Sequence, residues 1–482
     1  MSSPSISIVW FRQDLRLADN PALAAACARG GKILPVYILD DETPGSWRPG
    51  GASRWWLHES LSSLDRGLEV LGAKLCLRRG KAAEVIGALT KETGASAVFW
   101  NRCYEAHAIR RDTNLKANLR DQGIDAESFN ANLLFEPWEI KNGQGGPYKV
   151  FTPFWKALLA GPAPATPEPP PASVDGLRSV AGDSLADWNL RPDKPDWAGG
   201  LRKQWTPGEQ GAGQRLDAFL DEAAETYKTR RDQPAESGTS RLSPHLHWGE
   251  ISPRQVWQTC QRAIATGSVR EDAVMAFLRQ LAWRDFSHVL IYHWPDFPEK
   301  SWKPEYDSFP WRDDEQAFTA WCRGRTGYPI VDAGMRELWH TGWMHNRVRM
   351  ITASFLIKHL LIPWQRGEAW FWDTLVDADL ANNAAGWQWV AGSGADASPY
   401  FRIFNPITQG EKFDPQGHYI RRWVPELSKL PNDFLNKPWD APAEVLTAAG
   451  VTLGETYPLP MVDHKAARDR ALAGYQEMKK QA

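Results

Sequence analysis

Residues 341–406 read TGWMHNRVRMITASFLIKHLLIPWQRGEAWFWDTLVDADLANNAAGWQWVAGSGADASPYFRIFNP. In the first part of this stretch apolar residues recur at steps of three and four, which predicts one helix over residues 343–361. Asn346, Arg349 and Met350 share a face of that helix, because residues three and four apart are neighbours. The stretch therefore predicts a helix with an apolar stripe and a separate polar face.

The second part of the stretch concentrates acids, amides and indoles. The run DADLANN occupies residues 377–383, and Trp387 and Trp389 follow closely. An arginine can bind a carboxylate through two parallel hydrogen bonds, so Arg349 and Asp377 form either a structural ion pair or part of a ligand site. Together with Asp379 and Asn383 the pair could instead face a heterocycle that has both donors and acceptors at its edge. By itself this pattern leaves both interpretations open.

Length and composition limit the number of domains and the kinds of function that we can expect. A chain of 482 residues exceeds what one core usually holds, so we expect two domains. With a net charge of −2, a nucleic-acid site must be a local basic patch. The five cysteines are scattered without a CxxC pair, and there is no signal-peptide pattern or membrane-length apolar run, so we expect a cytoplasmic protein. The 26 tryptophans invite a role in stacking or electron transfer.

Residues 1–135 alternate strand and helix patterns. The alternation predicts a parallel sheet with helices on both faces. We expect strands at 6–11, 32–39, 74–77, 97–101 and 128–129, and helices at 21–29, 53–71, 82–93 and 105–122. The first helix would be capped by Asn20 and the second by Ser53. No GxGxxG follows the first strand, so a dinucleotide bound in the usual way is not expected.

The sequence pattern changes twice in the rest of the chain. Residues 136–212 show weak periodicity and include the proline-rich run 161–171, which predicts an irregular inter-domain linker. From residue 213 to 482 the pattern is helical almost throughout. The predicted fold class is a Rossmann-like α/β domain with a five-stranded parallel sheet, followed by an all-α domain.

Two smaller constellations have chemical potential. Thr239 to Ser243 place three hydroxyls and an arginine just before Pro244, at a predicted helix start. Such a helix end can bind a phosphate, although a simple serine cap explains the same pattern. Gln280, Trp283 and Arg284 share a helical face, which alone would indicate a solvated surface. The histidines have no third ligand at metal spacing, so no metal site is predicted.

Ordered motifs along the whole chain carry a resemblance to a known family. They are VWFRQDLR at 9–16, GTSRLS at 238–243, WRDF at 283–286, TGYPIVDA at 326–333, GWMHNR at 342–347, the 377–389 run and YFRIFNP at 400–406. With these motifs the chain resembles the photolyase/cryptochrome flavoproteins. The resemblance implies an FAD buried in the helical domain.

The resemblance assigns cofactor roles residue by residue. Arg349 and Asp377 would form the ion pair beside the flavin ring, Asp379 would contact the ring edge, and Asn383 would face N5. The full set implied to bind FAD is Tyr227, Thr239, Ser240, Arg241, Leu242, Ser243, Phe277, Gln280, Arg284, Asn346, Arg349, Asp377, Asp379 and Asn383. Trp387, Trp364 and Trp311 match the tryptophan chain that photoreduces the flavin.

The resemblance also implies a DNA lesion flipped into a cavity above the flavin. Its contacts would be stacking walls, polar side chains near the damaged bases, and arginines on the DNA phosphates. The residues implied for lesion and DNA binding are Arg231, Gln280, Trp283, Asn346, Arg347, Met350, Trp389 and Arg402.

The implied reaction is light-driven electron transfer from reduced FAD to a cyclobutane pyrimidine dimer, which makes the enzyme a carbon–carbon lyase (a deoxyribodipyrimidine photolyase). Relatives that repair (6-4) photoproducts have histidines where this chain has Asn346 and Met350, which favours the dimer as substrate. Common bacterial dimer photolyases have glutamate where this chain has Gln280. Glutamine can donate a hydrogen bond to a thymine carbonyl but supplies no charge.

A light-harvesting antenna is implied as well. The folate-type bacterial enzymes have an Asn-Glu pair where this chain has His107-Ala108. Residues 40–57 are more similar to plant cryptochromes and the related third class of dimer photolyases, which use methenyltetrahydrofolate. We therefore expect that folate, near Glu42 and His107, with a deazaflavin or no antenna as alternatives.

Two other functions compete with repair. A blue-light-sensing cryptochrome would share the scaffold, but cryptochromes generally carry a long C-terminal tail, whereas this chain ends soon after the predicted helix 465–480. A tryptophan-rich single-strand-binding module is the other alternative, and the buried-type motif set and the absence of a broad basic groove count against it. We expect a monomer that acts on damaged DNA without a membrane or a metal.

Overall fold

The computed structural model describes residues 5–397 and 402–481. Tyr400 and Phe401 of the 400–406 motif lie outside the described residues. The chain forms two compact units. The first comprises the described residues up to Glu225 together with Ser240–Pro295 and Val376–Ala381, and the second comprises Thr226–Thr239, Asp296–Leu375 and the described residues from Asn382 onward.

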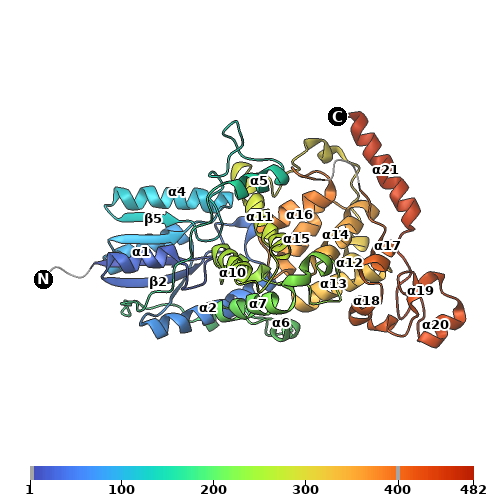
Figure 1. The fold of residues 1–482 in the computed structure, drawn as a ribbon, viewed down its shortest axis with the longest axis horizontal. Helices are drawn as coiled ribbons and strands as arrows, with labels where there is room; N and C mark the ends of the chain where they lie inside the picture. Colours follow the sequence, from blue (N-terminus) through green and yellow to red (C-terminus); the bar gives the residue numbers. More distant parts are fainter. Residues whose placement is uncertain (1–4, 398–401, 482) are drawn as a thin grey trace. The chain divides into compact units, whose positions relative to one another are not determined.

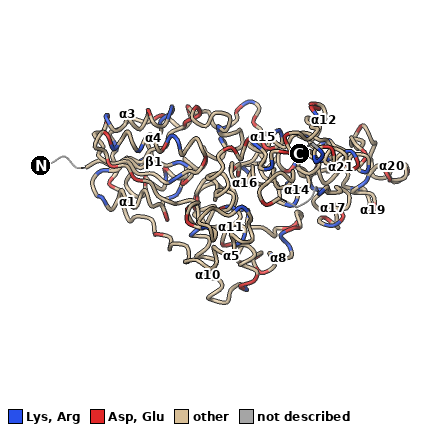
Figure 2. Tube along the Cα trace, turned by 90° about the horizontal axis from the view of Figure 1, so that it is seen from above, with Lys and Arg blue, Asp and Glu red and all other residues tan. Residues whose placement is uncertain are grey.

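The first unit contains a five-stranded parallel sheet, as predicted. The spatial order is β3-β2-β1-β4-β5, and every neighbouring pair is parallel. The strands are β1 (Ile6–Phe11), β2 (Lys32–Leu39), β3 (Cys76–Arg79), β4 (Ala97–Asn101) and β5 (Asp125–Phe129). Helix α1 (Pro21–Arg29) packs on β1, β4 and β5. Helices α3 (Ala82–Thr93) and α4 (Ala106–Asp121) pack on each other, α3 also on β2 and β3, and α4 also on β5. Figure 2 shows the sheet between α1 and the α3–α4 pair.

Local chemistry explains where several of these elements begin and end. The Asn20 side chain accepts the Leu23 amide at 3.1 Å and Pro21 occupies the first turn, which confirms the predicted cap of α1. Gly94 closes α3 at φ +69°, a conformation that glycine adopts without strain. The second helix, α2 (Gly51–Leu71), was predicted wrongly to start at Ser53. It begins two residues earlier, and Ser53 is buried inside it.

Three other element boundaries were predicted with small errors. The strand predicted at 74–77 is at Cys76–Arg79, the strand predicted at 128–129 extends over Asp125–Phe129, and the helix predicted at 105–122 is one residue shorter at each end. Strand ends depend on which backbone groups the neighbouring strand pairs, and periodicity within one segment does not contain that information. The kind and the order of the elements were predicted correctly.

Helices and irregular segments make up the rest of the first unit (Figure 1). They are α5 (Phe151–Ala160), α6 (Gly199–Gln204), α7 (Glu209–Glu222), α9 (Ser243–His247), α10 (Pro253–Ala265) and α11 (Glu271–His293). Residues 161–171 have no regular structure, as their prolines predict. The domain boundaries at 135 and 212 remain a prediction, because the two units are defined by packing rather than by what each part binds.

The described residues of the second unit form helices and connecting loops, without a sheet. Its helices are α8 (Tyr227–Arg230), α12 (Glu315–Cys322), α13 (Pro329–Thr341), α14 (Asn346–Ser354), α15 (Trp364–Thr374), α17 (Pro406–Phe413), α18 (His418–Trp423), α19 (Asn432–Leu435), α20 (Ala443–Ala449) and α21 (His464–Gln481), with short 3-10 turns such as η4 (Pro304–Ser308) and a π-helical turn η5 (Phe355–His359). Helix α16 (Leu380–Ala391) has its first two residues in the first unit. Helix α21 packs on η4 and η5.

The single helix predicted over 343–361 is wrong in two respects. Gly342, at φ +66°, ends α13, and α14 starts only at Asn346, because the His345 side chain accepts the Arg347 amide at 3.2 Å. After Ser354 the chain widens into the π-helical turn η5, in which the Leu360 amide reaches the Phe355 carbonyl. The residues from 355 to 362 are all buried, Lys358 and His359 included, so no alternation of exposed and buried positions marks the change.

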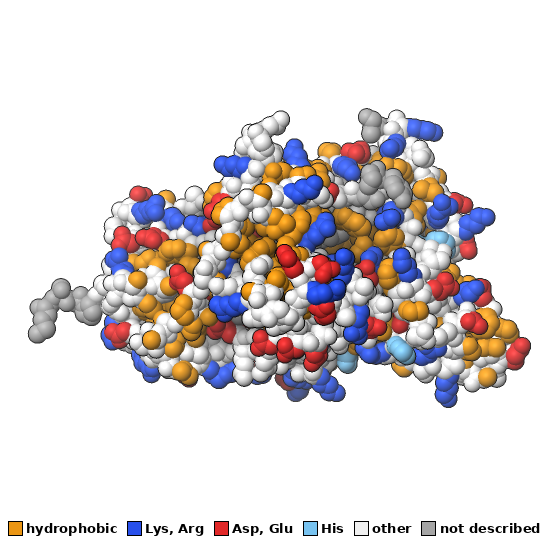
Figure 3. Space-filling view, in the orientation of Figure 1, with side chains coloured by type: hydrophobic (Ala, Val, Ile, Leu, Met, Phe, Trp, Pro, Cys, Tyr) orange, Lys and Arg blue, Asp and Glu red, His pale blue; other side chains and the backbone are white. Residues whose placement is uncertain are grey.

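Charge is spread in small groups. On the face of the molecule in Figure 3, basic and acidic side chains are interspersed rather than gathered into one broad basic surface. Among the described residues, no helix combines the length and the apolar composition needed to cross a bilayer. Any site for a polyanion on this face must therefore be local, which agrees with the net charge of −2.

Candidate functional site

The acidic segment Asp377–Asp379 lies in the first unit, immediately before α16. The Trp248 indole N–H donates to the Val376 carbonyl at 3.1 Å, and the Asp379 amide donates to the Asp377 carbonyl at 2.7 Å. Both carboxylates are buried, each with 8% of the residue surface exposed. A tight, anchored turn thus holds two acidic side chains out of contact with bulk water.

Two buried histidines flank Asp379. Asp379 Oδ2 lies 3.5 Å from His288 Nε2 and 4.0 Å from His247 Nδ1. Burial lowers the pKa of both imidazoles, while Asp379 acts in the opposite direction. His288 Nδ1 lies 3.0 Å from the Arg284 carbonyl, which can only accept, so Nδ1 carries the proton of the neutral ring. The Asp379 carboxylate therefore lies beside neutral imidazoles.

Two adjacent residues of α11, Arg284 and Asp285, bind backbone groups of distant segments. Arg284 donates to the backbone carbonyls of Asn132 and Leu246, and Asp285 accepts the amides of Leu134 and Phe135 at 2.8 and 3.2 Å. Burial raises the pKa of Asp285 to about 7. Arg284, predicted to bind the cofactor, thus also has a structural role, and Asp285 was overlooked because its partners are backbone groups about 150 residues away.

Helix α11 carries three other predicted residues, two of which pack against aromatic rings. The Trp283 ring stacks on Phe151 with centroids 3.7 Å apart and 9° between the planes. The Gln280 side-chain amide donates to the Ala276 carbonyl at 3.2 Å, and Phe277 is buried against Phe219 at 4.4 Å between centroids. Trp283 is half-buried and is held in a fixed orientation by Phe151, as a stacking wall requires.

The hydroxyl-rich run is divided between the units. Ser240 to Ser243 belong to the first unit, whereas Tyr227, Arg231 and Thr239 belong to the second. Arg241 adopts φ +52°, Leu242 rather than a serine occupies the cap position of α9, and Pro244 is in its first turn as predicted. In the second unit the Arg231 guanidinium lies 5.3 Å from the Tyr227 ring centre.

In the second unit α14 and α16 carry the remaining predicted cofactor contacts. Arg349 Nε donates to the Met344 carbonyl at 2.7 Å, and Asn383 Nδ2 donates to the Glu368 carbonyl at 3.1 Å. Asn346 and Met350 are in contact, at 3.9 Å between Nδ2 and Sδ, which confirms their predicted common face. Arg349 and Asp377 fall in different units, so their ion pair remains a prediction.

The three predicted electron-transfer tryptophans all belong to the second unit. Trp387 and Trp364 are buried, with 3% and 1% exposed, whereas Trp311 is half-buried. Trp387 packs against Phe371 at 5.0 Å between centroids. The indole N–H groups of Trp364 and Trp311 donate to Ser301 Oγ at 3.4 Å and to the Tyr306 carbonyl at 3.1 Å.

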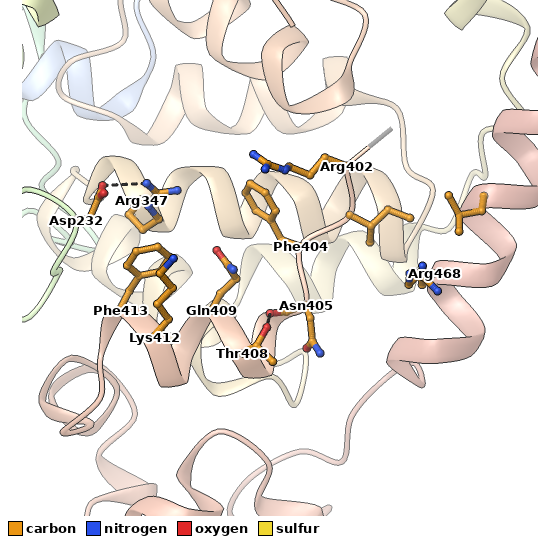
Figure 4. A pocket seen from close by; sticks show the side chains of 12 residues that line it. Asp232, Arg347, Arg402, Phe404, Asn405, Thr408, Gln409, Lys412, Phe413 and Arg468 are labelled. Carbon is orange, nitrogen blue, oxygen red and sulfur yellow. Dashed lines mark hydrogen bonds and ion pairs between the residues drawn. The ribbon is translucent and has the colours of Figure 1, made fainter. Parts of the chain in front are cut away.

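A groove of about 700 Å³ in the second unit brings together two predicted phosphate-binding residues (Figure 4). Arg347 comes from α14 and Arg402 from the segment before α17. The complete lining is Asp232, Arg347, Arg402, Ile403, Phe404, Asn405, Thr408, Gln409, Lys412, Phe413, Arg468 and Leu472. Four cations thus share one groove with amide and hydroxyl groups. Arg347 is paired with Asp232 at 3.0 Å and lies over the Phe413 ring at 4.5 Å.

Sequence reasoning missed half of the cations in this groove. Lys412 and Arg468 lie on α17 and α21, far from Arg347 in the chain, and each resembles an ordinary solvated residue of an amphipathic helix. Asp232 was also missed, although it follows the predicted Arg231 directly. Only the adjacency to Arg231 was a local signal. Trp389, by contrast, was predicted, and it lines a small adjoining hollow together with Arg402 and Phe404.

The two predicted antenna residues lie at the same edge of the sheet. Glu42 follows β2 and His107 opens α4 after β4, so both are near the carboxyl ends of parallel strands, where such sheets usually bind ligands. Glu42 pairs with Lys81 at 3.6 Å, and burial lowers the pKa of His107. This placement leaves the nature of any antenna as a prediction.

Comparison with known families decides the classification. The model "DNA photolyase" matches residues 7–172, and the model "FAD binding domain of DNA photolyase" matches residues 277–477. The two together cover most of the chain. The chain belongs to the DNA photolyase family. Within that family model, the FAD-binding part includes Arg349, Asp377, Asp379, Asn383 and the tryptophans at 311, 364 and 387.

Individual photolyase-family relatives are similar over nearly the whole length of this chain. The deoxyribodipyrimidine photo-lyase of Agrobacterium fabrum is 53% identical over 477 residues, which is 98% of each chain. Cryptochrome-1 of Arabidopsis thaliana is 42% identical over 97% of this chain and 70% of its own length. The crystal structure of a bacterial class III photolyase from Agrobacterium tumefaciens has a TM-score of 0.96 at 52% identity and covers 100% of this chain and 98% of its own.

Proposed function

We propose that this photolyase-family protein repairs cyclobutane pyrimidine dimers in DNA with light, as a deoxyribodipyrimidine photolyase. The observation that carries the proposal is the groove in which Arg347, Arg402, Lys412 and Arg468 converge. A DNA backbone needs several cations along one path, and side chains from three helices and a loop supply them here. The names of the relatives at 53% and 52% identity support the same activity.

The residues fit a bound flavin. Asp379 is a buried acceptor between neutral imidazoles, and His247 Nδ1 has no hydrogen-bond partner among the described residues. A buried polar atom of this kind calls for a ligand or water, and a flavin edge offers both N–H and carbonyl groups. We therefore assign FAD binding to Asp377, Asp379, Arg349 and Asn383, together with the other predicted cofactor residues. Bound and reduced, FAD supplies the electron for repair.

The chain's own residues would hold the electron path and the substrate. Trp387 and Trp364 are buried and Trp311 is half-exposed, which suits indoles that relay charge from a buried site toward solvent. Trp283, stacked on Phe151, is a rigid platform for a flipped base. Arg231, Arg347 and Arg402 would bind phosphates, and Trp389 would form the second stacking wall.

Lesion choice follows from three side chains. Asn346 and Met350 are in contact on α14, and neither can act as the acid or base that a histidine provides. That pair favours a cyclobutane dimer, whose cleavage needs an electron rather than a proton relay. Gln280, whose amide donates to the Ala276 carbonyl, retains a carbonyl oxygen and a second N–H for the lesion.

A methenyltetrahydrofolate antenna near Glu42 and His107 completes the proposal, and we expect a cytoplasmic monomer. The second candidate is a cryptochrome-type photoreceptor without repair activity, favoured by the 42% identity to the plant cryptochromes. The repair assay below distinguishes the two functions, because a photoreceptor would bind and reduce FAD without restoring the bases.

Illumination of the reduced protein with dimer-containing DNA tests the function. Repair should restore thymine absorbance in blue light and not in the dark. Protein that holds reduced FAD and yet restores no absorbance would refute repair and favour the photoreceptor. Trp387→Phe should abolish photoreduction of the flavin while sparing repair by chemically reduced enzyme. A near-ultraviolet band that disappears on denaturation and dialysis would identify the folate, and its absence after folate saturation would contradict that assignment.

A further inference from the structure

Side chains of α14 and η5 bind the backbone of the segment Arg402–Phe404. The Lys358 ammonium donates to the Arg402 carbonyl, and the Phe404 amide donates to Ser354 Oγ at 3.4 Å. Ser354 and Lys358 are four residues apart and bind the backbone on both sides of Ile403. Two side chains of one helical stretch therefore clamp three residues of the groove wall.

The clamp is buried, whereas the side chain that it presents is not. Ser354 and Lys358 have 1% and 3% of their surfaces exposed, but Arg402 is exposed in the groove. Ile403 packs into an apolar cluster that includes Leu361 and fixes the middle of the segment. Figure 4 shows the Arg402 and Phe404 side chains next to each other at one wall of the groove. The backbone of this wall is thus anchored at three successive residues.

A buried lysine needs a reason, because removing an ammonium ion from water is unfavourable. Burial, reinforced by the Arg402 guanidinium, lowers the pKa of Lys358 to about 7. From the α21 side, His359 faces His464 and Arg470. Burial lowers the pKa of His359 to about 3, so this imidazole gains no proton between pH 6 and pH 8, and burial also lowers the pKa of His464.

We propose that Lys358 is a positioning residue for DNA binding: it holds the Arg402–Phe404 backbone so that the Arg402 guanidinium meets a phosphate in the groove. The inference rests on the proposed DNA-binding function of that groove. Lys358 lines the small hollow shared by Trp389, Arg402 and Phe404, so the same clamp connects the phosphate-binding wall with the proposed stacking wall.

The proposal predicts coupling between Lys358 and Arg402. Lys358→Met removes the donor to the Arg402 carbonyl, and Arg402→Ala removes the phosphate contact itself. Each change should weaken DNA binding about tenfold. It should also make the fall of log K with log salt less steep, by about 0.9, the value for one phosphate contact. Because both changes remove the same contact, the double variant should bind no more weakly than either single variant.

The proposal also predicts a pH dependence. As the pH rises through about 7, Lys358 loses its charge and binds the Arg402 carbonyl less strongly. Wild-type affinity for DNA should therefore fall between pH 6 and pH 8. Lys358→Arg keeps the charge over this range and should remove that step while preserving the affinity found at pH 6.

Fluorescence anisotropy on the full-length holoprotein with a dimer-containing duplex measures all of these quantities. Lys429→Met is the matched control, since it removes an exposed lysine of the same unit that does not line the groove. Thermal denaturation checks folding, and Lys358→Arg and Ser354→Ala serve if Lys358→Met does not fold. Because Ser354→Ala also weakens the clamp, its log K should likewise fall less steeply with log salt.

The outcomes separate the two proposals. Unchanged affinity and salt slope in Lys358→Met, with weakened binding by Arg402→Ala, would overturn the positioning role while leaving the groove intact. Strictly additive losses in the double variant would overturn it as well. If neither Arg402→Ala nor Arg347→Ala weakens binding, the groove is not the DNA site and both proposals fail.

Discussion

Asp232 is the one acid lining the described groove, and its removal should strengthen DNA binding. The Asp232 carboxylate pairs with Arg347 at 3.0 Å, and their side chains are 36% and 20% exposed. A phosphate bound to the same guanidinium would lie near that carboxylate and be repelled by it. Asp232→Asn keeps the size and a hydrogen-bonding group but removes the negative charge.

The magnitude follows from Coulomb's law. Two unit charges about 6 Å apart repel by about 0.7 kcal/mol in a medium with the dielectric constant of water, and by about 1.4 kcal/mol at half that value. The affinity should therefore rise roughly three- to tenfold at low salt. The lost ion pair is partly exposed, so its contribution to the folded state is about 1 kcal/mol or less.

Salt titrations of DNA binding provide the assay. The gain for Asp232→Asn should shrink between about 0.05 M and about 0.3 M salt, because screening shortens the reach of the charge. Asp433→Asn, which removes an exposed acid outside the groove lining, is the control for net charge. If Asp232→Asn binds DNA no more tightly than this control at low salt, the placement of the phosphate beside Arg347 is wrong.

Three further predictions concern buried sites. A Cβ at Gly367 would lie 2.1 Å from Trp387 Cη2, so Gly367→Ala should cost about 1–3 kcal/mol in urea unfolding and slow the photoreduction of the flavin. Burial lowers the pKa of His359 to about 3, so the unfolded state binds the proton first; stability should fall by about 1.4 kcal/mol per pH unit below about pH 6.5, and His359→Phe should remove that component of the slope. Asp332, fully buried, accepts the Tyr457 hydroxyl at 2.7 Å, and Asp332→Ala should lower the unfolding free energy by about 3 kcal/mol, against a smaller loss for Asp332→Asn.

Local patterns were sufficient wherever one element contains its own signal. The β-α alternation, the Asn20 cap of α1 and the glycine that ends α3 all act within a few residues, so the parallel sheet was predicted correctly. The contact of Asn346 with Met350 was predictable for the same reason, because helical geometry brings residues four apart together. The family motifs extended this reasoning to the cofactor and the substrate.

Contacts between distant segments were not predictable from such patterns. Lys358 resembles a solvated helical lysine in the sequence, yet the structure buries it and directs it to the Arg402 carbonyl. The π-helical turn that carries it lies in a mostly apolar, wholly buried run without periodicity to mark it. Whether such a lysine is exposed or buried depends on which elements cover it, and its neighbours in the chain do not specify that.

The stretch 341–406 shows where the division lies. Its sequence determined by itself that polar and apolar faces alternate along α14 and that acids, amides and indoles cluster after residue 377. The tertiary structure alone decided that Arg347 pairs with Asp232 and shares a groove with Lys412 and Arg468. The reason is physical: a helix repeats every 3.6 residues whatever surrounds it, whereas a groove exists only after α14, α17 and α21 have packed.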